Sequence, residues 1–261
     1  MGVKSAERVL DILELLKEYP DGLTATEISG KLGYAPSSTF MLLKTMTEKG
    51  YLRDNQNKQY SLGARLISLG ACASEYLDLN QIAGPILKKL AEQVRETVFM
   101  AILSGDEIIY VEKVNSPRSI ANNAIVGGKK PVYCTGLGKA FLSFLPVEES
   151  NQILEHVQLK KITPNTITNR EELKKQLAAF RKQGYAIDNE EIETGLYCFS
   201  GPLYDASGHM TAAISVSGPT SRMKENEKQI LPCLLTASKE ISEKLGWYGV
   251  KPKVEAEKSD K

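Results

Sequence analysis

The sequence predicts an α+β protein with two domains, a small helical domain followed by a larger domain built on an antiparallel sheet. Its 261 residues, 42% of them hydrophobic, are enough to bury two cores. Residues 24–60 contain two short amphipathic helices, a tight turn and a hairpin. From residue 79 onward strands and helices alternate, as in domains whose helices pack on an antiparallel sheet.

A first helix is expected near the amino terminus, because apolar residues recur there at helical spacing with charged residues between them. The positions expected to supply the core of the small domain are Ala6, Val9, Leu10, Leu13 and Leu16.

The second helix begins after Thr24. Thr24 and Glu27 have the spacing of a capping box, in which each side chain satisfies a backbone donor at the helix start. Ile28 and Leu32 lie on one face, and Gly33 supplies the left-handed residue with which helices often end.

The third helix is the candidate recognition helix of a helix-turn-helix. Pro36 suits its first turn, and Leu42, Leu43 and Met46 can pack inward. The side chains left to face DNA are Ser37, Ser38, Phe40, Met41 and Lys44.

A hairpin follows Gly50, where the third helix is expected to end. Residues 51–54 and 58–62 alternate like strands around a polar turn at 55–57, which is the wing of a winged helix-turn-helix. The alternative is that this compact unit serves protein contacts only.

Charge is distributed unevenly in the small domain. Residues 29–60 carry five basic side chains against the two acidic ones of Glu48 and Asp54. The basic residues are Lys31, Lys44, Lys49, Arg53 and Lys58. Arg53 and Lys58 therefore join the predicted DNA contacts, and so small a positive charge indicates that a second copy is needed for firm binding.

Several classes of protein are disfavoured. No apolar run approaches the roughly 20 residues of a membrane span, and the start lacks a signal peptide, so a cytoplasmic protein is expected. The four cysteines are scattered and form no Cys-x-x-Cys pair, and the chain has two histidines, His156 and His209. Neither a metal site nor a cofactor is therefore expected.

The remaining elements are expected as follows. Residues 64–78 form a linker helix that pairs with a second chain through Leu66, Leu69 and Leu77. Helices are expected at 82–94, 136–145, 170–183 and 224–245; strands at 97–103, 107–114 and 210–217 and near Tyr185 and Tyr197; a loop at 115–131; and a disordered tail at 251–261.

Several segments, in this order and spacing, resemble the IclR family of bacterial transcriptional regulators over nearly the whole chain. They are residues 35–46, 50–65, 96–99, 136–142, 163–168, 184–191, 195–202 and 213–219. The resemblance implies a winged helix-turn-helix over 1–63, the linker helix over 64–78 and a GAF-like effector-binding domain over 79–250. It also implies dimers that often pair into tetramers.

One position departs from the family pattern. The family usually has arginine just before the Leu-Leu of the recognition helix, where this chain has Met41. A guanidinium can contact phosphate or guanine, so an altered operator preference is expected.

The resemblance also implies an effector pocket in the larger domain. Its residues are Gly136, Leu137, Asp188, Cys198, Ser215 and Ser217. Free donors at a helix start favour an anion, and two serines two apart on a strand share one face, so the set suits a small carboxylate. The resemblance to members that control sugar-acid catabolism favours a 2-keto-3-deoxy sugar acid and a repressor of a catabolic operon. In the alternative interpretation, the serines cap or face solvent, the cysteine is a small buried hydrophobe and Gly136 serves the turn.

Three competing functions remain open. One is a cytoplasmic enzyme acting on a small carboxylate, with Cys198 as nucleophile and Asp188 as acid or base; it lacks a motif that would link a histidine to Cys198. The second, nucleotide binding at residues 133–140, is disfavoured because Tyr133 and Ala140 occupy the positions of the required glycine and Ser/Thr. The third is a ligand sensor that binds protein through its amino-terminal domain.

Overall fold

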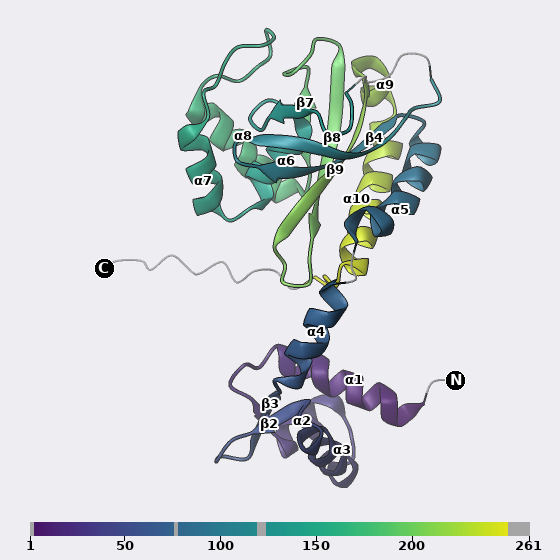
Figure 1. Cartoon of the computed structure of the whole chain (residues 1–261), viewed down its shortest axis with the longest axis vertical. Helices are drawn as coiled ribbons and strands as arrows, with labels where there is room; N and C mark the ends of the chain where they lie inside the picture. Colours follow the sequence, from purple (N-terminus) through teal and green to yellow (C-terminus); the bar gives the residue numbers. More distant parts are fainter. Residues whose placement is uncertain (1–2, 76–77, 119–123, 250–261) are drawn as a thin grey trace. The chain divides into compact units, whose positions relative to one another are not determined.

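The computed structural model describes residues 3–75, 78–118 and 124–249. The chain divides into two compact units, residues 1–77 and 78–261, and each is described by itself. Figure 1 labels most of their helices and strands. Leu77 and the predicted tail at 251–261 lie outside the described residues.

The first unit combines helices with a small sheet. Its elements are α1 (Lys4–Lys17), β1 (Leu23–Thr24), α2 (Ala25–Leu32), α3 (Pro36–Glu48), β2 (Leu52–Asp54), β3 (Gln59–Leu62) and α4 (Arg65–Glu75). The three strands pair antiparallel in the order β1-β3-β2. Strand β1 was not predicted, because two residues are too short to show alternation.

The start of the second helix agrees with its prediction. The Thr24 hydroxyl accepts from the Glu27 N–H at 3.3 Å, and the Glu27 carboxylate accepts from the Thr24 N–H at 2.8 Å. Gly33 follows α2 with a φ of 67°, and α3 begins at Pro36. The predicted capping box, the turn and a third helix that begins at Pro36 are therefore confirmed.

The core of the first unit uses a different stripe of α1 from the one predicted. Ile12 and Leu16 are buried, and Val9 and Leu13 pack against them. Leu10 is 61% exposed and Ala6 is also exposed, so their assignment to the core is wrong. The stripe that packs inward follows the spacing i, i+3, i+4, i+7 from Val9, and Leu10 falls outside it.

Helix α4 leaves the wing through a close backbone contact. A Cβ at Gly63 would lie 2.3 Å from the Gly50 carbonyl oxygen, so this position requires glycine. The Gly63 N–H also donates to the Tyr51 carbonyl at 2.8 Å. Along α4, Leu66 is half-buried and Leu69 is 49% exposed.

The second unit has twelve elements in its described part. They are α5 (Leu79–Val94), β4 (Thr97–Ser104), β5 (Glu107–Val114), β6 (Lys129–Pro131), α6 (Gly136–Phe144), α7 (Val147–His156), α8 (Arg170–Gln183), β7 (Ala186–Asn189), β8 (Leu196–Tyr204), β9 (Met210–Pro219), α9 (Thr220–Glu225) and α10 (Glu227–Lys244). The strands form one antiparallel sheet in the order β6-β5-β4-β9-β8-β7.

Three details of this unit differ from the expected elements. Strand β6 lies within the segment predicted as a loop, and α7 was not predicted. The helix expected at 224–245 corresponds to α10, whereas the short helix α9, which is separated from it at Asn226, was not predicted. The Asn226 side chain donates to the Arg222 carbonyl at 2.9 Å, and this local bond competes with continuation of the helix.

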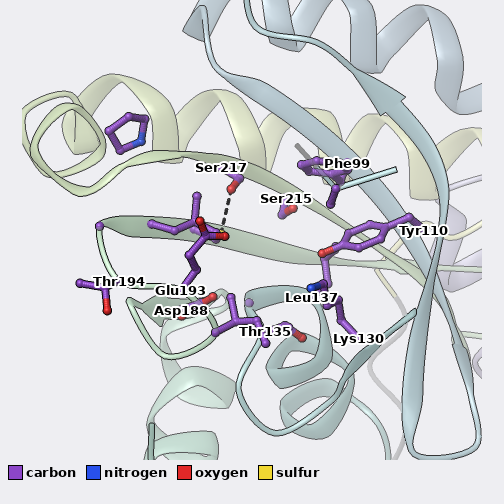
Figure 2. A pocket seen from close by; sticks show the side chains of 17 residues that line it. Phe99, Tyr110, Lys130, Thr135, Leu137, Asp188, Glu193, Thr194, Ser215 and Ser217 are labelled. Carbon is purple, nitrogen blue, oxygen red and sulfur yellow. Dashed lines mark hydrogen bonds between the residues drawn. The ribbon is translucent and has the colours of Figure 1, made fainter. Parts of the chain in front are cut away.

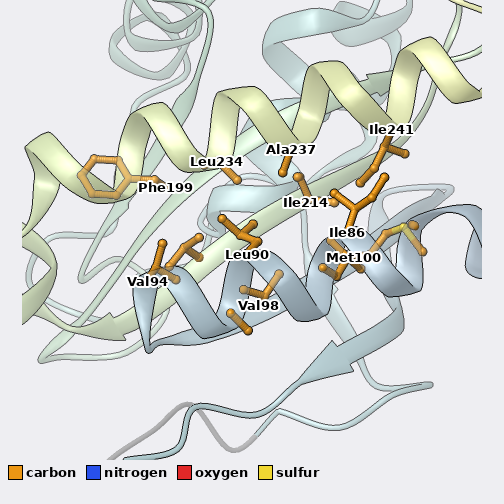
Figure 3. Packing of buried hydrophobic residues seen from close by; sticks show 14 of the residues in the cluster. Ile86, Leu90, Val94, Val98, Met100, Phe199, Ile214, Leu234, Ala237 and Ile241 are labelled. Atoms are coloured by element: carbon orange, nitrogen blue, oxygen red, sulfur yellow. The ribbon is translucent and has the colours of Figure 1, made fainter.

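The two faces of the sheet belong to two cores. Along β4, Val98 and Met100 point to one face, whereas Phe99 and Ala101 point to the other. Helices α5 and α10 cover the first face, and Figure 3 shows their apolar side chains meeting over the strands. Helices α6, α7 and α8 belong to the second core. Polar side chains of β7, β8 and β9 lie on that second face.

Candidate functional site

Helix α3 presents one exposed side to its surroundings. Thr39, Leu43 and Met46 are buried. Phe40 is 51% exposed and Met41 is 61% exposed. Ser37 and Lys44 are also exposed, and these four residues lie at positions that recur on one side of a helix. This side has the mixture of hydroxyl, apolar and cationic groups with which helices contact the major groove.

Ser38 differs from the other residues predicted on α3. It is half-buried, and its hydroxyl donates to the Ala35 carbonyl at 2.9 Å. Arg8 of α1 reaches the same hydroxyl at 3.5 Å, and its guanidinium lies 4.9 Å from the centre of the Tyr34 ring. Arg8 therefore places a cation beside the start of α3, which the sequence pattern did not indicate.

The wing presents two further cations. Arg53 is exposed and donates to the Ser61 hydroxyl at 3.0 Å across the β2-β3 pair. Lys58 is exposed and has a φ of 56°. The Asn55 carboxamide oxygen accepts from the Asn57 and Gln59 N–H groups, each at 3.0 Å, and so fixes the turn between the strands.

A cavity of about 460 Å³ opens in the second unit. All six residues of the predicted effector set line it (Figure 2). The others are Phe99, Tyr110, Ala124, Lys130, Thr135, Ile192, Glu193, Thr194, Gly195, Leu196 and Pro219. Its volume falls in the range of small-molecule sites, roughly 300–1,000 Å³.

Three neighbouring strands bring polar side chains to the cavity. Cys198 of β8 lies opposite Ser217 of β9 and opposite Asp188 of β7. Ser215 follows on the same face of β9. The Cys198 thiol donates to the Ser217 hydroxyl at 3.1 Å. All four side chains are almost completely buried. Because the local dielectric is low there, a hydrogen bond between one of their polar atoms and a ligand is stronger than it would be at the surface.

The first turn of α6 packs against these strand residues. Thr135 caps the helix, and its hydroxyl accepts from the Gly138 N–H at 3.1 Å. A Cβ at Gly136 would lie 2.6 Å from the Ser200 hydroxyl and 3.1 Å from Cys198 Cβ, so glycine permits the close approach. The first N–H groups of a helix have no partner within it, and Gly136 and Leu137 carry them into the cavity lining.

Asp188 is an acid of the cavity lining whose pKa is shifted by burial. Its Oδ1 accepts from the Glu191 N–H at 2.8 Å, whereas its Oδ2 has no partner within the described part of the chain. Burial raises the pKa of Asp188 to about 7, although the backbone hydrogen bond acts in the opposite direction. The carboxyl group can therefore donate or accept at neutral pH.

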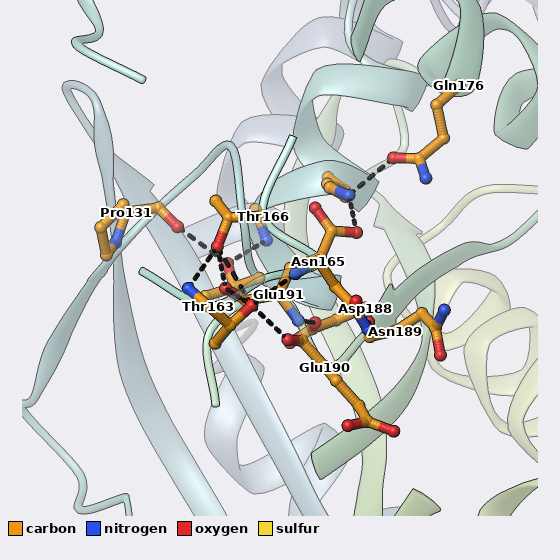
Figure 4. A network of polar contacts seen from close by, with 12 residues as sticks. Pro131, Thr163, Asn165, Thr166, Gln176, Asp188, Asn189, Glu190 and Glu191 are labelled. Carbon is orange, nitrogen blue, oxygen red and sulfur yellow. Dashed lines mark hydrogen bonds and ion pairs between the residues drawn. The ribbon is translucent and has the colours of Figure 1, made fainter. Parts of the chain in front are cut away.

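A polar network holds the loop that forms one wall of the cavity (Figure 4). Lys139 of α6 is fully buried; it binds the Glu191 carboxylate and donates to the Gln176 side-chain oxygen at 2.6 Å. Burial lowers the pKa of Lys139, and its ion pair with Glu191 opposes that effect. Thr163 and Thr166 donate to the carbonyls of residues 190 and 191 at 2.6 and 2.7 Å.

The geometry gives no support to nucleophilic catalysis by Cys198. Burial raises the pKa of the thiol, and the nearby charge of Asp188 raises it further. No histidine lines the cavity, and His156 and His209 are exposed at the end of α7 and before β9. A thiol that stays protonated and has no base beside it is a poor nucleophile.

The described part of the chain has neither a metal-binding cluster nor a membrane-spanning helix. Residues 3–75, 78–118 and 124–249 contain no cluster of three His, Cys, Asp or Glu side chains suited to a metal ion. Over the same ranges, no helix has both the length and the apolar character needed to cross a bilayer.

Sequence reasoning missed part of the cavity lining. Phe99 shares a face of β4 with Ala101, and strand alternation alone was enough to indicate it. Strand alternation was also enough to place Tyr110 of β5 on the face that lines the cavity. Lys130 lies in a three-residue strand inside the predicted loop, and Glu193 and Thr194 lie in the loop before β8, so no pattern pointed to them.

Comparisons with known proteins agree with this architecture. The sequence model described as the IclR helix-turn-helix domain matches residues 5–56, and the one described as bacterial transcriptional regulator IclR C-terminal matches residues 72–243. The chain is 35% identical over 248 residues to the HTH-type transcriptional regulator KdgR of Escherichia coli (strain K12), which covers 94% of each protein.

Two further similarities extend over most of the chain. It is 34% identical over 244 residues to the transcriptional repressor IclR of Escherichia coli (strain K12), covering 92% of this chain and 89% of that protein. The crystal structure of the Thermotoga maritima IclR protein matches with a TM-score of 0.63 and 32% identity, covering 94% of this chain and all of that one. The chain therefore belongs to the IclR family of bacterial transcriptional regulators, and it is a DNA-binding regulator rather than an enzyme.

Proposed function

We propose that this regulator represses a catabolic operon and that a small carboxylate bound in the cavity controls its affinity for DNA. The observation that carries the proposal is the placement of a helix start beside buried hydroxyl, thiol and carboxyl groups in one cavity. Backbone donors at a helix start favour an anion, and the groups on the strands suit hydroxyl or keto oxygens.

The size and polarity of the cavity support a sugar acid as effector. About 460 Å³ is far more than a two- or three-carbon acid fills. The carboxylate is placed at Gly136 and Leu137, and the hydroxyl and keto groups are placed against Asp188, Ser215 and Ser217. A 2-keto-3-deoxy sugar acid has this arrangement of groups.

The DNA contacts are assigned to α3 and the wing. They are Ser37, Ser38, Phe40, Met41, Lys44, Arg53 and Lys58. All of them except half-buried Ser38 are exposed, which supports the assignment. Met41 offers an apolar contact, such as one to a thymine methyl group, where the family usually has an arginine.

We further infer that the working unit is a homodimer, or a tetramer made of two such dimers. The first unit exposes apolar side chains on α1 and α4, among them Leu10, Ile67 and Leu69. Covering them with a second copy removes this surface from water and doubles the small positive charge that a single copy offers to DNA. Two copies related by twofold symmetry match a pseudo-palindromic operator.

Replacing Ser217 tests the effector site. A Ser217→Leu change fills space at the buried floor of the cavity. We therefore expect it to abolish the response to 2-keto-3-deoxygluconate and to leave the affinity for DNA in the absence of the acid unchanged. Fluorescence anisotropy with a labelled operator, with and without the acid, measures both quantities. A response as large as that of the unaltered protein would remove Ser217 from the effector site.

A further inference from the structure

Lys130 is a cation in the cavity lining to which neither the sequence pattern nor the family resemblance assigns a role. It lies on β6, opposite Ile108 of β5. Its neighbour Lys129 points to the other face of the strand and lies 3.6 Å from the Glu107 carboxylate. The two lysines are therefore adjacent in sequence, but only Lys130 borders the cavity.

The ammonium group of Lys130 is directed into the cavity. Figure 2 shows its side chain extending past Leu137, at the start of α6, toward the hydroxyl end of Tyr110. Glu193 and Thr194 lie on the other side of the cavity in the same view. The residue is half-buried, so part of its stem is already removed from water.

Within the described ranges the Lys130 ammonium has neither a hydrogen bond nor an ion pair. The buried acids are engaged by other groups: Glu191 pairs with Lys139, and Asp188 receives the Glu191 N–H and lies near Lys139. Tyr110 gives no anion, because burial raises the pKa of its hydroxyl. The positive charge of Lys130 is thus not neutralised by the buried acids of the site.

A helix start and a cation that border the same cavity favour the same ligand group, an anion. An independent observation also points to a ligand. The Oδ2 atom of Asp188 is fully buried in the cavity lining and has no partner within the described residues. An acid that carries a hydroxyl or keto group provides both an anion for the helix start and a partner for Asp188.

We propose that Lys130 determines the specificity of the cavity by pairing with the carboxylate of the effector at the start of α6. This inference rests on the proposed effector function and names a residue and an ion pair within it. The preferred ligands are polyhydroxy or keto acids in the carboxylate form. Their neutral carboxamides, which have the same shape, bind more weakly because they leave the ammonium unpaired.

The test is calorimetric titration of the full chain with 2-keto-3-deoxygluconate and with its carboxamide. We expect Lys130→Met to weaken binding of the acid roughly 10- to 100-fold, as expected for loss of a charge-assisted contact, and to change binding of the carboxamide little. Lys130→Arg should restore part of the preference for the acid. Lys129→Met is the matched control and should bind both ligands like the unaltered protein.

The outcomes separate this inference from the proposed function. If the unaltered protein prefers the acid and Lys130→Met keeps the full preference, the role of Lys130 is wrong and the effector site stands. Equal binding of acid and carboxamide by the unaltered protein would also overturn the role of Lys130. If the unaltered protein binds neither 2-keto-3-deoxygluconate nor gluconate, pyruvate or glyoxylate, the proposed effector function fails as well. Urea unfolding followed by the fluorescence of Trp247, which lies in the same unit as Lys129 and Lys130, shows whether each variant is folded.

Discussion

Asp188 is a buried residue with one carboxylate oxygen in a structural hydrogen bond and one that we propose for the ligand. One of its oxygens accepts from the Glu191 N–H and so holds the loop that forms one wall of the cavity. The other oxygen has no partner among the described residues. The charged groups near it are Lys139 and Glu191, whereas Cys134, Cys198 and Tyr110 remain neutral because burial raises their pKa values. Its carboxyl group therefore titrates close to neutral pH.

The raised pKa of Asp188 predicts a pH dependence of stability. The pKa is about 7 in the folded chain and 3.8 in an unperturbed carboxyl group, so the neutral form stabilises the fold. That contribution is complete below about pH 4 and is lost as the pH rises through about 7. We expect the free energy of unfolding to fall by about 3 kcal/mol between pH 5 and pH 8 through this group. Asp188→Asn should lack this component, because an amide keeps the acceptor and carries no charge.

The measurement is urea unfolding of both proteins at the two pH values. Trp247 is the one tryptophan of the chain and lies in the second unit, where its ring packs 4.8 Å from that of Tyr204, so its fluorescence reports unfolding of that unit. The same change with pH in both proteins would contradict a titrating Asp188.

Lys44 of helix α3 is predicted to contact the phosphates of DNA. Lys44 is exposed, and its ion pair with Glu48, 3.9 Å away, is too open to neutralise it. We expect Lys44→Ala to weaken DNA binding several-fold and to reduce the salt dependence of the affinity by about one counterion for each copy bound. Lys17→Ala, at the exposed end of α1, is the control and should leave the salt dependence unchanged. An unaltered salt dependence in Lys44→Ala would remove this residue from the phosphate contacts.

The sequence predicted elements well where one local signal dominates. The Thr24–Glu27 capping box predicted the start of α2, and a segment rich in charged helix-forming residues predicted α8. Prediction from the sequence failed where the pattern is short or where the structure depends on the rest of the fold. Strand β6 exists because β5 pairs with it, and Leu10 looked like a core residue because apolar spacing alone cannot tell which side of α1 is covered. The convergence of β7, β8, β9 and α6 on one cavity was implied by family resemblance, and the contribution of Lys130 required the structure.

The proposed function requires coupling between two sites that belong to different units. A ligand in the cavity changes DNA affinity only if it binds the DNA-competent and DNA-incompetent states differently, and the effect is reciprocal. A change in the pairing of two α4 helices, which alters the spacing of the two recognition helices, is the proposed means of coupling. Such coupling requires that the protein bind specific DNA sites and that its affinity for them depend on the acid.

Selection of genomic DNA fragments by the purified protein, with and without 2-keto-3-deoxygluconate at near-physiological salt, tests this requirement most directly. Sequencing of the retained fragments should give a few sites that share an inverted repeat, recovered without the acid and lost in its presence. Retention of fragments without a common sequence, or of the same sites to the same extent in both conditions, would contradict the account.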